Sequence, residues 1–304
     1  MKRIHIFFVQ LWVTFRTTLK TFIAENCLRY SASLSYYTIF SLAPLLIITI
    51  SLLGYFFGRQ AMEGRIFSEI RAQVGDVAAL QIQQMIRHIV TTEGSFIARL
   101  VGILIMVIGV AAVFTEVQDA INHIWKLKPI PKLNRKKFLI KRIISLGIFS
   151  VIGFILVLSL IINLLINVLG NYLIDLFANA GIFIVFAINR AFIIAVVAVL
   201  FTLMFKYLPD GFVKWKDAIK GAVFTSFFFM IGKALIGYFL GHLNTTSAYG
   251  AAGSLVVLLL WIYYSSVIIY FGATFTKVYA YLYGGKIIPR PYAVYLETKE
   301  IMPG

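Results

Sequence analysis

Long apolar runs alternate with short polar gaps along this chain, and six of the runs are long enough to cross a lipid bilayer. A membrane-spanning helix needs about 20 predominantly apolar residues, because a helix rises only about 1.5 Å per residue. No water-soluble fold needs six such stretches, so the pattern predicts an all-α integral membrane protein with six transmembrane helices. The predicted spans are 32–57, 97–115, 143–169, 181–205, 221–240 and 252–276.

Two other segments show the spacing of amphipathic helices. In residues 1–31, apolar side chains recur at helical intervals among basic residues, which predicts an interfacial helix on the cytoplasmic leaflet. A cytoplasmic helix packed on the bundle is an equally good interpretation. Residues 58–96 carry two apolar stripes and predict short external amphipathic helices between the first two spans. The predicted division is a cytoplasmic segment 1–31, a transmembrane domain 32–276 and a cytoplasmic tail 277–304.

The basic residues fall almost entirely into every second gap between the runs. These gaps and the two terminal segments hold 21 of the 28 Lys and Arg residues. Because cytoplasmic loops carry the Lys and Arg excess, both termini are predicted to lie on the cytoplasmic side of the membrane. The net charge of +16 then faces anionic membrane lipids. Nucleic acid is not expected as a partner, since the chain has no base-stacking or groove-reading motif.

Composition supports a single membrane domain rather than two soluble ones. The chain is 61% hydrophobic and 13% charged, with a mean hydropathy of +0.90. Its one cysteine, Cys27, excludes an intramolecular disulfide.

Two cations lie well inside the predicted spans. Arg190 and Lys233 are roughly 13 and 10 Å from the outer ends of the fourth and fifth spans, counted at the helical rise. Ionisable residues at such depth are costly and usually functional. Either protein groups and water solvate them, or an anionic ligand does. The predicted substrate-binding residues are Arg190, Lys233 and three amides, Asn163, Asn167 and Asn189.

The first span contains a proline surrounded by small polar residues. Pro44 removes a backbone hydrogen bond nearly halfway across, and Ser35 and Ser41 lie within nine residues of it. One interpretation is a kink whose backbone groups are satisfied by hydroxyls. The other is a discontinuous helix that lines a substrate path.

Several of these segments, in this order, resemble one known family. They are SASLSYYTIFSLAPLLIITISLLGYFFG, YLPD at 207–210, GAVFTSFFFMIGKALIGYFL, and YGAAGSLVVLLLWIYYSSVIIYFGATFTKVY. Together they are similar to the YihY/BrkB family of six-span bacterial inner-membrane proteins, over roughly residues 15–285. The resemblance implies a membrane protein whose biochemical activity is not settled, with export of lipids or small solutes among the proposals.

That family has also carried the label ribonuclease BN, which the residues do not support. A zinc-dependent hydrolase needs clustered His and acidic ligands. The four histidines, His5, His88, His123 and His242, are scattered over both predicted sides of the membrane. The sequence also lacks a P-loop and a nucleophile elbow. The prediction is therefore no enzyme, no metal and no cofactor.

Two functions remain open from the sequence. The first is a transporter or flippase-like protein for an anionic lipid or a small anionic solute. The second is a structural or regulatory membrane protein that binds partners through its basic cytoplasmic loops. The sequence does not determine the oligomeric state.

Overall fold

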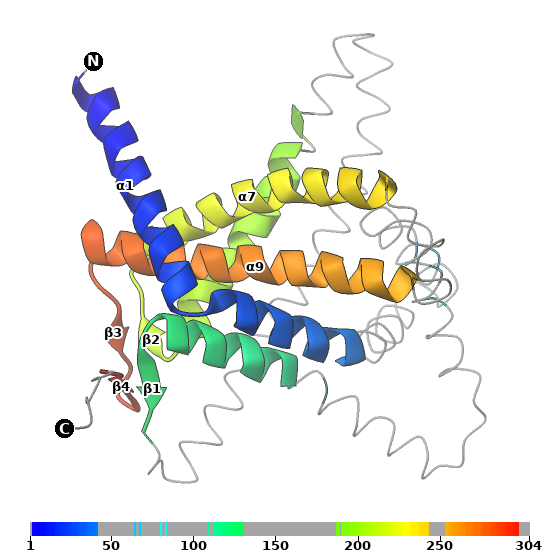
Figure 1. Cartoon of the computed structure of the whole chain (residues 1–304). Helices are drawn as coiled ribbons and strands as arrows, with labels where there is room; N and C mark the ends of the chain where they lie inside the picture. Colours follow the sequence, from blue (N-terminus) through cyan, green and yellow to red (C-terminus); the bar gives the residue numbers. More distant parts are fainter. Residues whose placement is uncertain are drawn as a thin grey trace, which may run out of the picture. The chain divides into compact units, whose positions relative to one another are not determined.

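The computed structural model describes residues 2–41, 112–130, 190–242 and 253–297, with the single residues 64, 67, 80, 83, 109, 187 and 188. This part of the chain is mostly helical (Figure 1). It forms two compact units, the first made of Met1–Glu25, Ile121–Met230 and Phe271–Gly304, the second of Asn26–Ala120 and Ile231–Tyr270. The helices are α1 (Lys2–Ala24), 27–41, 112–124, Arg190–Tyr207, α7 (Trp215–His242) and α9 (Gly253–Leu282).

Three described helices are long and apolar enough to cross a membrane. They are Arg190–Tyr207, Trp215–Ile236 and Leu258–Leu282, which correspond to the fourth, fifth and sixth predicted spans. α9 continues to Leu282, six residues past the predicted end of the last span. The other three predicted spans and the external segment 58–96 lie wholly or mostly outside the described residues. That the chain has six transmembrane helices therefore stays a prediction.

The N-terminal segment forms a helix, as its spacing predicts, but α1 ends at Ala24. Its inner face, with Thr14, Thr18 and Phe22, is buried. Phe22 packs edge-on against Phe271 of α9, with ring centroids 5.6 Å apart. The opposite face leaves apolar side chains exposed, including Trp12 at 66% and Ile23 at 64%. α1 therefore packs on a membrane-type helix through one face, and its interfacial position stays a prediction.

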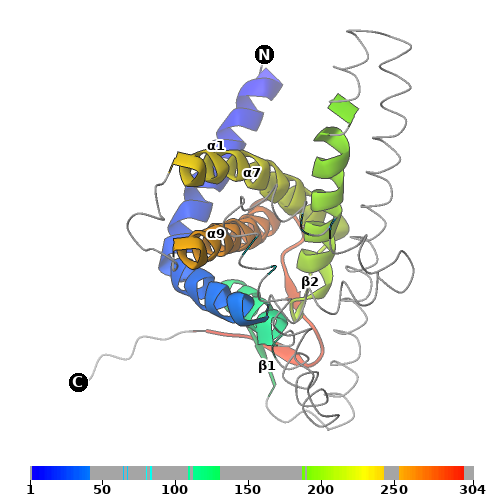
Figure 2. The same ribbon diagram turned by 90° about the vertical axis from the view of Figure 1, so that its right-hand side faces the viewer.

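In the first unit, α7 and α9 meet through two copies of one short motif (Figures 1 and 2). The motif is GAVFT at 221–225 on α7 and GATFT at 272–276 on α9. A Cβ added to Gly221 would lie 1.9 Å from Thr276 Oγ1, and a Cβ added to Gly272 would lie 1.9 Å from Thr225 Oγ1. Each threonine thus fills the space left by the glycine of the other helix. Only glycine allows the two backbones to approach this closely.

The same motif also pairs its two phenylalanines and satisfies its own hydroxyls. The rings of Phe224 and Phe275 are stacked with centroids 3.7 Å apart and planes inclined by 5°. Thr225 donates to the Gly221 carbonyl at 2.6 Å, and Thr276 donates to the Gly272 carbonyl at 2.8 Å. Because each hydroxyl is used inside its own helix, the contact surface between the helices is closely packed without unsatisfied hydroxyls.

The first unit also contains four short strands that an all-α prediction missed. β1 (Leu127–Pro129) pairs antiparallel with β4 (Ala293–Tyr295), and Leu127 lies opposite Tyr295. β2 (Gly211–Phe212) pairs antiparallel with β3 (Ile288–Pro289). Strands of two or three residues are too short to produce a period-two pattern, so hydropathy does not reveal them. They join two loops to the segment that follows α9.

Candidate functional site

A carboxylate marks the point where α1 ends. Glu25 follows the last helical residue, and its amide still donates to the Thr21 carbonyl at 2.9 Å. The next residue, Asn26, has a φ of 53°, a left-handed conformation that asparagine tolerates better than most residues and that terminates the helix. Glu25 is only 9% exposed. A carboxylate buried to this extent needs hydrogen bonds or opposite charges.

Two lysines supply that charge, and a histidine lies beside the same carboxylate. Lys126 Nζ lies 2.6 Å from Glu25 Oε2, and His123 Nε2 lies 3.6 Å from the same oxygen. Lys277 Nζ, from α9, lies 3.7 Å from Glu25 Oε1 and also donates to the Ile124 carbonyl oxygen. The cluster of Glu25, His123, Lys126 and Lys277, here called the Glu25 cluster, joins the ends of α1 and of helix 112–124 to α9.

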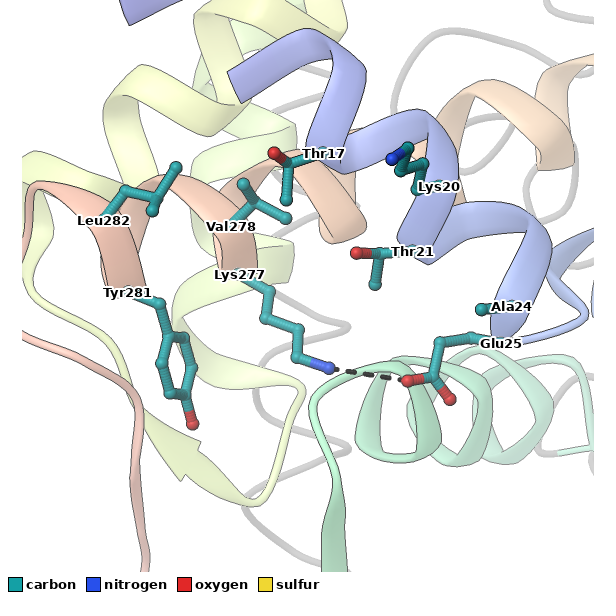
Figure 3. A pocket seen from close by; sticks show the side chains of 9 residues that line it. All are labelled: Thr17, Lys20, Thr21, Ala24, Glu25, Lys277, Val278, Tyr281 and Leu282. Atoms are coloured by element: carbon teal, nitrogen blue, oxygen red, sulfur yellow. Dashed lines mark ion pairs between the residues drawn. The ribbon is translucent and has the colours of Figure 1, made fainter. Parts of the chain in front are cut away.

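A cavity of about 440 Å³ lies beside the Glu25 cluster, between α1 and α9 (Figure 3). From α1 it is lined by Thr17, Lys20 and Thr21, and from α9 by Lys277 and Tyr281. Figure 3 shows the Lys277 side chain reaching from α9 toward Glu25, with Thr21 above the gap between them. Two ammonium groups, three hydroxyls and the Glu25 carboxylate therefore line one cavity.

A second polar contact fixes the loop that precedes α7. The Asn122 amide nitrogen donates to Asp210 Oδ2 at 2.9 Å, and the Asp210 backbone amide donates to Asn122 Oδ1 at 2.8 Å. Asp210 is 1% exposed, and its carbonyl accepts from the Arg290 amide at 3.0 Å. The Arg290 guanidinium donates to the Tyr207 carbonyl at 3.2 Å. This YLPD loop is thus attached to helix 112–124 and to the C-terminal segment, which indicates a structural role.

The residues predicted to bind substrate are only partly described. Arg190 lies in the first unit with its side chain exposed, and Lys233 lies in the second unit and is half-buried. Asn163, Asn167 and Asn189 lie outside the described residues. A shared site that contains Arg190 and Lys233 therefore stays a prediction.

The predicted helix break is also described in part. Pro44 lies outside the described residues, whereas Ser35 and Ser41 lie in helix 27–41 and are buried. Ser35 donates to the Ser31 carbonyl at 2.7 Å, and Ser41 donates to the Thr38 carbonyl at 3.1 Å. Both hydroxyls donate to backbone carbonyls of their own helix.

Sequence reasoning did not single out the Glu25 cluster. Its four members are spread over 253 positions of the chain, and only the fold brings them together. One signal was available, since Glu25 is the only acidic residue among the first 60. A lone carboxylate in a strongly basic segment is a candidate for an ion-pair centre. Within the described residues, no group of three or more His, Cys, Asp or Glu residues could hold a metal ion.

Comparison with known proteins gives the family. The sequence profile described as Virulence factor BrkB matches residues 18–291. A UPF0761 membrane protein of Stenotrophomonas maltophilia is 26% identical to the chain, over 84% of the chain and 58% of that protein. A UPF0761 membrane protein of Ralstonia nicotianae is 27% identical, over 80% of the chain and 53% of its own length. One from Tolumonas auensis is 22% identical, over 80% of the chain and 77% of its own length.

The chain thus spans little more than half the length of the Stenotrophomonas and Ralstonia relatives. No solved structure matches it. The profile match covers nearly the whole chain, and the relatives are membrane proteins, in agreement with the three described helices that could cross a bilayer. The chain is a membrane protein of the Virulence factor BrkB family.

Proposed function

We propose that this protein is a transporter or flippase-like protein of the bacterial cytoplasmic membrane, acting on an anionic lipid or a small anionic solute. The observation that carries the proposal is that Arg190 and Lys233 belong to helices apolar enough to span the membrane, Arg190 as the first residue of Arg190–Tyr207 and Lys233 near the end of Trp215–Ile236. Both fall inside the predicted spans 181–205 and 221–240. A cation at the centre of a span costs about 2.5 to 3.5 kcal/mol on insertion scales, and such residues commonly mark substrate pathways.

On two of the described spans, the basic residues are separated along the length of the helix. Lys206, Lys220 and Lys277 lie toward the end of the spans where the strands and the Glu25 cluster are found. Arg190 is 16 residues from Lys206 along one helix, and Lys233 is 13 residues from Lys220 along α7. At the helical rise these separations are roughly 24 and 20 Å. Along either helix, an anion that crosses the membrane would meet positive charge at two depths.

The surroundings of Lys233 add a polar group at its level. A Cβ added to the neighbouring Gly232 would lie 1.0 Å from the Tyr264 hydroxyl, so this phenol lies directly against the α7 backbone. The Tyr264 hydroxyl thus lies against the residue that precedes Lys233 in α7. This hydroxyl and the Lys233 ammonium can both donate hydrogen bonds to an anion.

The proposal is tested by transport in proteoliposomes. Purified full-length protein is reconstituted, and movement of fluorescent phosphatidylglycerol and phosphatidylcholine between leaflets is measured with and without an imposed proton gradient. Arg190→Gln and Lys233→Gln should each slow phosphatidylglycerol movement by roughly ten-fold, because each removes a charge-assisted hydrogen bond. The control is Lys216→Gln, which removes the same charge from an exposed position of α7.

Equal rates for the wild type and both variants would refute the role of Arg190 and Lys233. If the wild type moves neither lipid and no small anion, the transport proposal fails. The alternative, a structural or regulatory protein that binds partners through its basic loops, would then be the better account.

A further inference from the structure

We propose that the cavity between α1 and α9 binds the phosphate group of an anionic glycerophospholipid. This site is distinct from the predicted one at Arg190 and Lys233, and the inference does not depend on transport. It rests on the charge balance of the cavity, on the hydroxyls that line it and on the apolar surface beside it.

The charge balance favours an anion. Lys20 and Lys277 line the cavity, and Lys126 contacts the far oxygen of Glu25 at 2.6 Å. Lys126 and Lys277 contact the Glu25 carboxylate, and Lys20 adds a third ammonium group in the cavity wall, so these four groups carry a net charge of about +2 even with His123 neutral. Lys126 holds Oε2 of the carboxylate, so the repulsion that Glu25 exerts on an incoming anion is reduced. A phosphate between Lys20 and Lys277 would balance the remaining charge.

The other polar groups of the cavity suit a phosphate as well. Thr17 and Thr21 lie one turn apart on α1 and line the same side of the cavity as Lys20 (Figure 3). Hydroxyls donate hydrogen bonds to the acceptor oxygens of a phosphate, and lysine supplies point charges. A volume of about 440 Å³ is within the range of small-molecule sites and accommodates a headgroup.

The apolar surroundings favour a lipid over a soluble phosphate. Leu19 and Ile23 of α1 are exposed and share a face with the exposed Trp12, and Lys20 lies beside that face, one turn from Ile23. On α9, Tyr281 and Leu282 are exposed at the end of a segment apolar enough to span the membrane. Tryptophan and tyrosine at such positions are typical of the level of lipid headgroups. Acyl chains could therefore cover Leu19 and Ile23 while the phosphate occupies the cavity.

The test measures lipid binding by the purified full-length chain in a neutral detergent. Dioleoylphosphatidylglycerol, dioleoylphosphatidylcholine or inorganic phosphate is titrated, and the shift in melting temperature gives the half-saturating concentration. Phosphatidylglycerol should stabilise the wild type, and phosphatidylcholine should not. Lys20→Gln should raise the half-saturating concentration roughly ten-fold, because it removes one charge-assisted contact.

Three further variants make the outcome specific to the cavity. Arg16→Gln removes an exposed charge one turn away on the same helix, outside the cavity lining, and should change the half-saturating concentration by less than about two-fold. Arg190→Gln should retain phosphatidylglycerol binding, so transport can fail while this site remains. Lys277→Gln should also weaken binding, but it removes the hydrogen bond to the Ile124 carbonyl as well. The Lys20→Gln result is therefore the decisive one.

Equal binding by the Lys20→Gln and Arg16→Gln proteins would overturn the site. Equal stabilisation by phosphatidylcholine would overturn the selection for an anion. Saturation by inorganic phosphate at the same concentration as phosphatidylglycerol would overturn the assignment to a lipid.

Discussion

At the scale of single residues, Glu25 links several elements of the first unit, although the sequence did not mark it as a candidate residue. Its carboxylate is nearly buried, and it contacts basic groups from the turn after helix 112–124 and from α9. Removing one partner of a buried ion pair destabilises the folded protein, since the remaining charges stay partly buried without an opposite charge. The Glu25 cluster is thus a structural centre, and two of its members, Glu25 and Lys277, also line the cavity.

A neutral isostere at this position tests that role. Glu25→Gln keeps the side-chain volume but leaves Lys126, Lys277 and His123 without their carboxylate, and it should destabilise the protein by about 1 to 3 kcal/mol. Thermal unfolding of the purified protein measures the loss, with the exposed Glu297→Gln as control. The same change makes the cavity more positive, so binding of phosphatidylglycerol should persist. A melting temperature equal to that of the control would show that the cluster contributes no stability.

Sequence reasoning selected single residues as candidates only where one property of the local sequence was enough to mark them. Arg190 and Lys233 stand out because a charge in an apolar run is visible without a fold. Glu25 and Asp210 did not stand out as a centre and an anchor, because their roles depend on Lys277 and Asn122, which are distant in sequence. Pairing between distant residues is a property of the tertiary structure, and one sequence contains no direct signal for it.

At the scale of elements, the contact between α7 and α9 depends on two glycines and two threonines that fill each other's space. The notable property is reciprocity, since each helix supplies one glycine and one threonine at the same spacing. The Gly221 contact and the Gly272 contact should therefore respond alike to substitution.

Gly221→Ala provides the test. The new methyl group would lie 1.9 Å from Thr276 Oγ1 and 2.9 Å from its Cβ, so the helices must separate, at a cost of about 1 to 3 kcal/mol. Gly109→Ala is a matched control, because its Cβ would meet only ordinary contacts at 3.7 Å with Ser41. Thermal unfolding should show a much larger loss for Gly221→Ala.

A second substitution separates this contact from a general effect on the helix. Thr276→Gly removes the atoms that the methyl group introduced by Gly221→Ala would meet. The double variant should therefore recover part of the stability that Gly221→Ala alone loses. Strict additivity of the two losses would contradict the proposed contact.

Hydropathy predicted the long helices and missed the short strands. The described helices Arg190–Tyr207, α7 and α9 lie where long apolar runs predicted spans, because a helix of this length has a strong signal in any window. Boundaries were less accurate: α9 continues past Thr276 through Lys277 and Tyr281, which carry polar groups that can extend to a membrane interface. β1 and β2 were missed because strands of three and two residues give no hydropathy pattern, and their pairing partners follow α9, more than 70 residues away.

At the scale of the whole molecule, the distribution of basic residues predicts the orientation in the membrane. Lys216 lies at the start of α7, near Lys214 and Lys220, in one of the gaps assigned to the cytoplasm. Single cysteines in a Cys27→Ala background should react with an impermeant reagent from outside at positions 76 and 245, and only after permeabilisation at positions 134 and 216. Labelling of intact cells measures this. The reverse pattern would place both termini outside.

The strands of the first unit also have a consequence for the timing of biosynthesis. β1 cannot pair until β4 has been synthesised, about 160 residues later, and β2 must wait for β3. At roughly 5 to 20 residues per second, the β1 edge remains unpaired for about 10 to 30 s after it leaves the ribosome. Unpaired edges are sites of wrong association. Quality control of a nascent chain would therefore depend on residues 288–295, although every predicted span precedes them.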